Sequence, residues 1–112
     1  MELLSHVEAN DVLVIAFHED NIDAGNVRKF KELIQPLIQS HARVVFDLSG
    51  VRFIDSSGLG ALISCLRQLN TRCGDLRLCR LETTVQALFE MMRMNRVFNI
   101  HGSREEAVAS LG

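Results

Sequence analysis

The apolar residues of this chain change their spacing several times, from short β-branched runs to the three-and-four spacing of helices, and this alternation limits the possible folds most. Leu3–Val7 and Val12–Phe17 are short apolar runs, and residues 8–11 between them include Asn and Asp. Because Asn and Asp favour tight turns, the two runs are predicted to form a hairpin.

A first helix is predicted from Ala24 to Gln39. Its apolar positions recur at helical spacing, and they are Val27, Phe30, Ile34, Leu37 and Ile38. Asp23 is well placed to begin this helix. Pro36 removes a backbone hydrogen bond, so we expect a kink or an end in the last turn.

The central part of the chain predicts further strands and a second helix. Arg43–Leu48 is a nearly continuous apolar run, which is typical of a strand covered on both faces. Val51–Ile54 precedes a helix that begins at Ser56 and ends within residues 70–74. Leu76–Cys79 predicts another strand.

Two capping-box patterns indicate the starts of the last two helices. Thr83 stands three residues before a Gln, and Ser103 stands three residues before a Glu. Val97–Ile100 predicts a short strand between them. The alternation therefore predicts one α/β domain over residues 1–112, with a mixed, mostly parallel sheet of about five strands, an amino-terminal hairpin and four helices.

Composition argues against several classes of protein. Ser56–Leu66, the longest uncharged stretch of the central region, is far shorter than the roughly 20 residues of a membrane-spanning helix. The amino terminus lacks the features of a secretory signal, so we expect a cytoplasmic protein without membrane insertion. The net charge is −2 and neither Trp nor Tyr occurs, which makes a nucleic acid a poor candidate partner.

The cysteines do not indicate a disulfide framework or a metal site. Cys65, Cys73 and Cys79 are odd in number and form no CxxC pair. We expect all three to be buried thiols, and we expect no bound metal or cofactor.

The segment FIDSSGLGAL, residues 53–62, combines a carboxylate, two hydroxyls and two glycines where a strand gives way to a helix. The simplest interpretation makes Ser56 the N-cap, with Asp55 complementing the helix dipole. Capping does not explain Gly58 and Gly60, since a glycine inside a helix costs about 1 kcal/mol relative to alanine. Glycines are kept where another element or an incoming group approaches the backbone. An exposed hydroxyl at a helix start also suits a phosphate.

Catalysis and nucleotide binding fit the same segment poorly. A serine nucleophile requires a general base, and the chain has no Gly-x-Ser-x-Gly elbow. The Gly58–Ala61 stretch is not followed by the Gly-Lys-Ser/Thr of a phosphate-binding loop.

The run VVFDLSGVRFIDSSGLGAL, residues 44–62, closely resembles the signature of STAS domains, the family of the bacterial anti-sigma-factor antagonists. Asn21-Ile22-Asp23 matches the place where the family has an acidic residue before its first helix. The resemblance implies a small α/β domain that binds a partner protein. That partner is often a serine kinase of the histidine-kinase-like ATPase superfamily that doubles as an anti-sigma factor.

The resemblance also implies roles for individual residues. The phosphorylated serine of the family corresponds to Ser56, with Ser57 as the second choice. Asp23 is expected near Ser56, where it helps to orient the hydroxyl or the metal-bound phosphate of the kinase. The residues expected to support the phosphorylation site are Asp23, Asp55, Gly58 and Gly60, and those expected to contact a partner are Asn21, Asp23, Ser56, Ser57 and Leu59.

These expectations describe a binding switch without catalysis of its own. The form with a free Ser56 binds the kinase or another regulator, phosphorylation blocks binding, and a PP2C-type phosphatase is a further implied partner. One alternative is a constitutive STAS scaffold or subunit of a transporter or lipid-trafficking complex. Another is a small acyl- or phosphoryl-transfer enzyme with Ser56 as its nucleophile.

Overall fold

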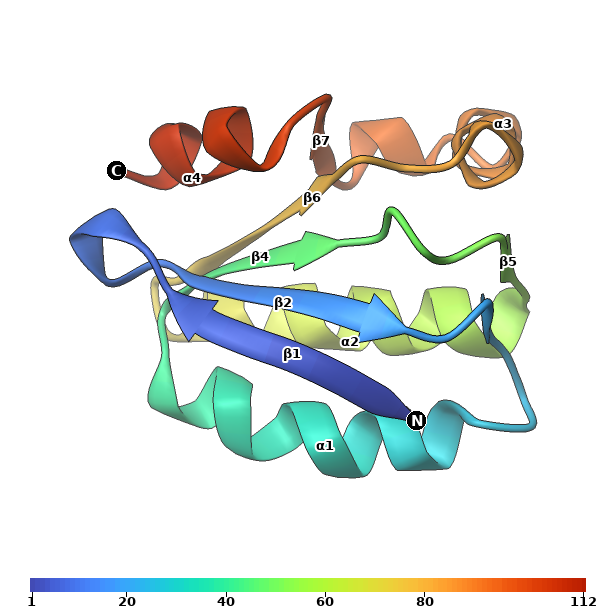
Figure 1. Cartoon of the computed structure of the whole chain (residues 1–112), viewed down its shortest axis with the longest axis horizontal. Helices are drawn as coiled ribbons and strands as arrows, with labels where there is room; N and C mark the ends of the chain where they lie inside the picture. The colour runs from blue at the N-terminus through green and yellow to red at the C-terminus, as the bar shows by residue number, and fades with distance from the viewer.

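A five-stranded sheet organises the computed structural model, which describes residues 1–112 (Figure 1). Its elements are β1 (Glu2–Val7), β2 (Leu13–His18), β3 (Asn21–Ile22), α1 (Val27–Ser40), β4 (Arg43–Asp47), β5 (Phe53–Ile54), α2 (Ser56–Thr71), β6 (Asp75–Cys79), α3 (Thr83–Met91), β7 (Asn99–His101) and α4 (Arg104–Leu111), with 3₁₀ turns at Ala9–Asp11 and Met94–Arg96. The strand order is β1-β2-β4-β6-β7, with β1 antiparallel to β2 and the other neighbours parallel. The predicted mixed sheet, hairpin and four helices are confirmed.

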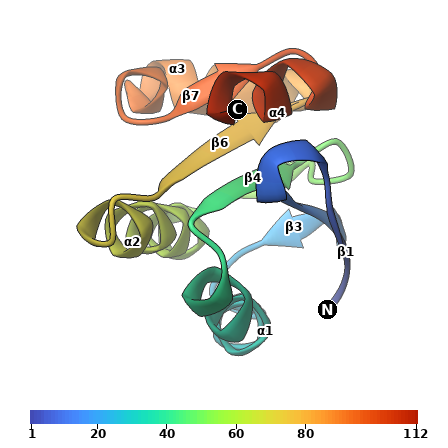
Figure 2. The same cartoon turned by 90° about the vertical axis from the view of Figure 1, so that its left-hand side faces the viewer.

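Helices cover both faces of the sheet. One continuous apolar core joins α1, α2 and α3 to the strands, through residues such as Phe30, Leu62 and Phe89. A smaller cluster on the opposite face packs Ala107 of α4 against β2, β4 and β6. Figures 1 and 2 show α1 and α2 on one side of the strands and α4 on the other. None of the helices is long and apolar enough to cross a membrane.

The boundaries of α1 differ from the sequence prediction. The helix begins at Val27 instead of Ala24, because the carboxylate of Asp23 accepts the N–H of Gly25 at 2.9 Å and holds residues 23–26 in a turn. The N-cap is Asn26, so the prediction that Asp23 begins the helix was wrong. The helix continues one turn beyond Pro36 and ends at Ser40.

Three further predictions need correction. Of the predicted strand Val51–Ile54, only Phe53–Ile54 pairs, and it pairs with β3 in a separate two-stranded sheet. Thr83 is the first residue of α3 and forms no capping box, since Glu82 is the N-cap and its side chain makes no capping bond. Cys73 is exposed where α2 ends, although Cys65 and Cys79 are buried as expected.

The last strand begins two residues later than predicted and ends one residue later. The N–H of Phe98 donates to the carbonyl of Met94 at 2.8 Å, which keeps that stretch in a turn, and β7 begins at Asn99. Ser103 is confirmed as the N-cap of α4, because its hydroxyl accepts the N–H of Glu106 at 3.1 Å.

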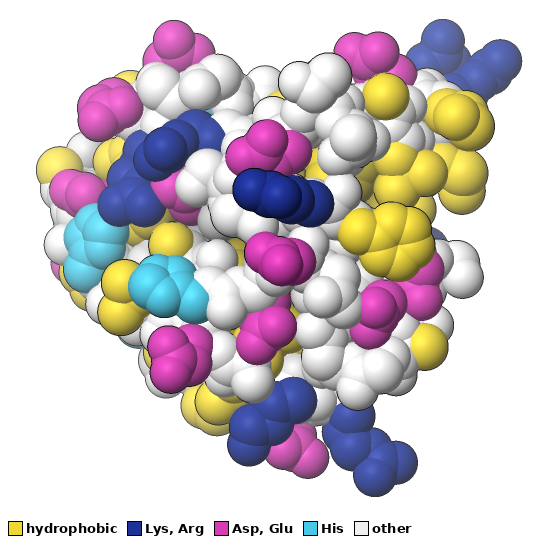
Figure 3. All heavy atoms as spheres, turned by 45° about the vertical axis from the view of Figure 1, so that its right-hand side comes forward, with side chains coloured by type: hydrophobic (Ala, Val, Ile, Leu, Met, Phe, Trp, Pro, Cys, Tyr) yellow, Lys and Arg dark blue, Asp and Glu magenta, His cyan; other side chains and the backbone are white.

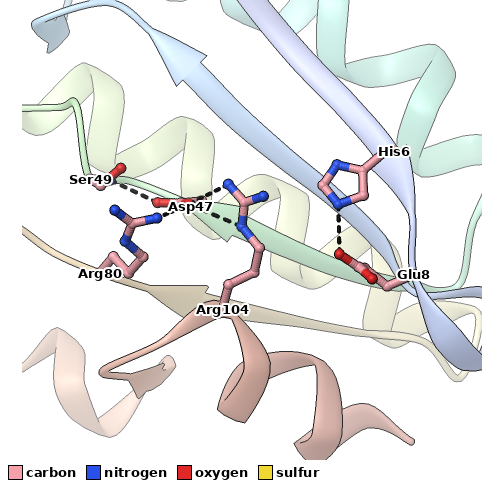
Figure 4. A network of polar contacts seen from close by, with 6 residues as sticks. All are labelled: His6, Glu8, Asp47, Ser49, Arg80 and Arg104. Carbon is pink, nitrogen blue, oxygen red and sulfur yellow. Dashed lines mark hydrogen bonds and ion pairs between the residues drawn. The ribbon is translucent and has the colours of Figure 1, made fainter.

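Asp47, at the end of β4, is the one charged residue that is fully buried, with 1% of its surface exposed. Its Oδ2 accepts hydrogen bonds from Nη2 of Arg104 at 2.6 Å and from Nη1 of Arg80 at 3.2 Å, and its Oδ1 accepts the N–H of Ser49 at 3.0 Å (Figure 4). These bonds attach α4 and the loop after β6 to the centre of the sheet. Burial by itself would raise the pKa of Asp47, but the bonds from Arg104 and Ser49 and the charge of Arg80 outweigh it and lower the pKa.

We predict that Asp47→Asn lowers the free energy of unfolding by about 2 kcal/mol at pH 7, the usual range for a hydrogen bond to a charged group. A carboxyl with a lowered folded pKa stabilises the fold above its unfolded pKa of about 3.9 and loses that contribution as the pH falls through the folded pKa. Urea titrations between about pH 7 and pH 2 should therefore show the difference from wild type shrinking in acid.

Glu32→Gln serves as the control for this measurement. Glu32 forms only a surface pair with Lys29 at 3.8 Å, so its replacement should change the unfolding free energy by less than about 0.5 kcal/mol. A deficit in Asp47→Asn that stays constant across the pH range would contradict the assigned role of the carboxylate.

Candidate functional site

The two-stranded sheet of β3 and β5 brings together the segments that precede α1 and α2. The strands are parallel, with Ile22 opposite Ile54, and the N–H of Asp55 donates to the carbonyl of Ile22 at 3.3 Å. Asp23 and Asp55 are the next residues of the two segments. The pairing therefore places Asp23 beside Asp55, the residue that precedes α2.

Asp55 is the N-cap of α2. Its Oδ1 accepts the N–H of Gly58 at 2.9 Å, and its Oδ2 accepts the N–H of Ala24 at 3.0 Å. The hydrogen bond from Gly58, joined by those from Ala24 and Ser57, lowers the pKa of the carboxyl. The interpretation of Ser56 as the N-cap was wrong, because the side chain of the preceding residue already fills that position.

Ser56 and Ser57 are the first two residues of α2, and both are exposed. Neither hydroxyl makes a hydrogen bond with another group of the chain. The predicted position of Ser56 at an exposed helix start is thus confirmed. A free hydroxyl in this position can be reached by a protein that modifies it.

The two glycines of the motif have different reasons to be glycine. A Cβ at Gly58 would collide with the carbonyl oxygen of Ile22 and lie 3.0 Å from Cγ2 of Ile54. Gly58 therefore allows the β3 backbone to approach α2, as expected for a glycine under close packing. A Cβ at Gly60 would meet nothing within 4 Å, so packing inside the chain does not require this second glycine.

Asp23 and Asn21 shape the loop beside the serines. The Asp23 carboxylate accepts the side-chain N–H of Asn21 at 2.6 Å and the N–H of Gly25 at 2.9 Å. Nδ2 of Asn26 donates to the carbonyl of Asn21 at 2.7 Å. Asn21 and Asp23, two of the residues predicted to contact a partner, are therefore part of an ordered turn next to Asp55.

Leu59 differs from the other predicted partner contacts. Its side chain is 6% exposed and belongs to the main core cluster. We leave Leu59 out of the proposed docking surface for this reason.

Two backbone groups of the site were missed by sequence reasoning. The N–H of Ala24 and the carbonyl of Ile22 both contact the start of α2, and no side-chain pattern indicates them. A signal did exist for the role of Asp55, because aspartate is as favourable an N-cap as serine.

The arrangement places an exposed hydroxyl directly after the N-cap Asp55, which is bonded to the turn that contains Asp23. The chain has no group of three or more His, Cys, Asp or Glu side chains placed to hold a metal ion. No histidine or other base is hydrogen-bonded to Ser56, whereas a serine nucleophile works with such a base.

Comparisons with known proteins point to one family. A family model described as STAS domain matches residues 5–107. A Bordetella bronchiseptica protein named as an anti-sigma factor antagonist, BtrV, is 31% identical over 101 residues, which cover 89% of this chain and 87% of that protein.

Two solved structures show the same fold at lower identity. An anti-sigma-factor antagonist (STAS) domain protein from Planctomyces limnophilus matches with a TM-score of 0.87 at 21% identity over 97% of both chains. The Bacillus cell fate determinant SpoIIAA, in its phosphorylated form, matches with a TM-score of 0.73 at 18% identity over 99% of this chain and 100% of that one.

We predict that Gly58→Ala destabilises the protein by about 1–3 kcal/mol, the usual cost of forcing extra atoms into a packed site. Gly60→Ala is the matched control, since the added methyl meets open space. It should leave the unfolding free energy unchanged or raise it by up to about 1 kcal/mol through helix propensity. Urea denaturation of the two variants beside wild type measures both effects, and an equal change in both would refute the close approach of β3 at Gly58.

Proposed function

Because this chain belongs to the STAS domain family, we propose that it is a protein-binding switch of the anti-sigma-factor-antagonist type, controlled by phosphorylation of Ser56. In the unphosphorylated form it binds a serine kinase of the histidine-kinase-like ATPase superfamily that also acts as an anti-sigma factor. Phosphorylation ends this interaction, and a PP2C-type phosphatase restores it. The protein acts in the cytoplasm as a substrate and a binding module and catalyses no reaction.

The observation that carries the proposal is the free, exposed hydroxyl of Ser56 at the start of α2, with Asp23 and Asp55 beside it. Ser57 is also exposed and remains the second choice. The proposed docking surface consists of Asn21, Asp23, Ser56 and Ser57, and we name it the Ser56 face.

The effect of phosphorylation follows from the charges already present. A phosphate adds nearly two negative charges, and a helix N-terminus normally stabilises an anion. Here the carboxylate of Asp55 already accepts the N–H of Gly58, so a phosphate on Ser56 would add its charge to an occupied site. In a complex the phosphate must lose its water, and the neighbouring carboxylates of Asp23 and Asp55 cannot offset its charge, which is unfavourable by several kcal/mol. A hundredfold loss of affinity needs only about 2.8 kcal/mol.

We predict that the serine kinase purified from the native host, with ATP, adds one phosphate to the wild-type protein, at Ser56. Ser56→Ala should remain unlabelled because it lacks the acceptor oxygen, and Ser57→Ala is the matched control that should still be labelled. Intact-mass measurement followed by peptide mapping distinguishes the three proteins. Equal labelling of Ser56→Ala and wild type would refute the assignment.

We also predict that Ser56→Asp weakens kinase binding at least tenfold, whereas Ser56→Ala binds within about threefold of wild type. Tenfold corresponds to about 1.4 kcal/mol, and a single aspartate carries less charge than a phosphate. Isothermal titration calorimetry with the purified kinase gives the affinities. Equal affinities for all three proteins would favour the constitutive scaffold over the switch.

A further inference from the structure

An apolar groove lies between β5 and α3, next to the Ser56 face. It has a volume of about 300 Å³, and its lining residues are Arg52, Phe53, Ile54, Thr84, Val85, Ala87, Leu88 and Met91. Figure 3 shows hydrophobic side chains gathered at the upper right of the face turned to the viewer, at the end of the molecule that carries β5 and α3. We name this feature the β5–α3 groove.

The walls of the groove expose large apolar side chains that the core does not use. Phe53 of β5 is 55% exposed and Met91 of α3 is 78% exposed, whereas Val85 and Phe89 of α3 are buried in the core. The inward side of α3 is therefore satisfied, and Phe53 and Met91 are left for another molecule. Clustered exposed apolar side chains are a common feature of interaction surfaces.

The groove and the Ser56 face adjoin each other through β5. Phe53 lies two residues before Asp55, and the carbonyl of Asp20 accepts its N–H at 3.1 Å. The hydroxyl of Thr84 donates to the carbonyl of Arg52 at 2.9 Å and so fixes α3 to β5. A protein that contacts Ser56 therefore has the groove next to it on the other side of β5.

Arg52 gives the groove a charge that lacks a partner. Its side chain is exposed and takes part in no ion pair or side-chain hydrogen bond, unlike Arg80 and Arg104. Aromatic residues, Met and Arg are the types enriched at protein interfaces, and the groove presents one of each in Phe53, Met91 and Arg52. A carboxylate is the complement of a free guanidinium.

We propose that the β5–α3 groove is the second half of the surface that binds the kinase, and that it accepts a large apolar side chain with a neighbouring carboxylate that pairs with Arg52. This inference rests on the proposed function, since the occupant is the partner of the Ser56 face. The groove also adds a second electrostatic contribution to the proposed switch. A phosphate on Ser56 repels the carboxylate that the partner brings to Arg52.

Photo-crosslinking in the native host tests the groove separately from the switch. The photoreactive residue p-benzoylphenylalanine replaces Ala87 in the groove, Ala24 beside Ser56, or Val7 as the control. Ala87 and Ala24 are exposed, and Val7 is 54% exposed and faces a separate hollow beside Ser40 and His41. A fourth variant at Met91 probes the groove from its most exposed residue. Thermal unfolding confirms that each variant is folded, and mass spectrometry identifies the crosslinked proteins.

We predict that positions 87, 91 and 24 crosslink to the same histidine-kinase-like ATPase, that position 7 does not, and that adding Ser56→Asp abolishes the crosslinks. Capture of the ATPase at position 24 but at neither 87 nor 91 would overturn the groove and leave the proposed function intact. Failure of all positions to capture an ATPase would overturn both. Equal capture at position 7 would also overturn the groove, because the contact would not be specific.

Affinities for the captured kinase provide the quantitative test. Phe53→Ala and Arg52→Glu should each raise the dissociation constant at least tenfold, because one removes the apolar contact and the other repels the carboxylate. Arg52→Lys should stay within about fivefold of wild type, since it keeps the charge, and Val7→Ala within twofold. Wild-type affinity in both Phe53→Ala and Arg52→Glu would refute the proposal, even if Ser56→Asp still releases the kinase.

Discussion

The carboxylate of Asp55 is the contact on which the site depends, because it joins two segments that are 31 residues apart in the chain. One oxygen accepts the N–H of Gly58 in the first turn of α2, and the other accepts the N–H of Ala24 in the loop before α1. The short pairing of β3 with β5 brings the start of α2 close to the segment before α1. The missing side chain of Gly58 leaves space for this approach. This carboxylate therefore helps to hold the start of α2, where Ser56 is exposed, against the loop before α1.

The hydrogen bonds of Asp55 also affect how the start of α2 interacts with an anion. A helix N-terminus whose N–H groups are free attracts an anion, and a phosphate placed there would be held by the chain itself. Asp55 already accepts one of these N–H groups, that of Gly58, and the turn around Asp23 adds a second carboxylate whose hydrogen bonds come from within its own loop. A phosphate on Ser56 would therefore remain outside the fold as an added charge. In the proposed switch, such a charge acts on the partner.

The sequence predicted the large elements well because they depend on local periodicity. The second helix, the buried strand at Arg43–Asp47 and the opening hairpin all have clear apolar patterns. The β3–β5 sheet was not predicted, since strands of two residues have no period and form through a long-range contact. The choice between Asp55 and Ser56 as N-cap could not be made from propensity, because both residue types cap equally well and the register of β5 decides. Leu59 was misassigned although it starts the apolar spacing that continues at Leu62, which already indicates the core.

Gly60 is the residue of the motif that the fold does not explain. It lies inside a helix, is exposed and has no neighbour within 4 Å of a Cβ, yet a glycine there costs about 1 kcal/mol relative to alanine. Residues four apart in a helix are neighbours on one face, so any side chain at position 60 would stand beside the hydroxyl of Ser56. In the proposed switch, the absence of that side chain lets a partner lie flat against the first turns of α2. The stability given up at Gly60 is then explained by access to Ser56, just as the close approach of β3 explains Gly58.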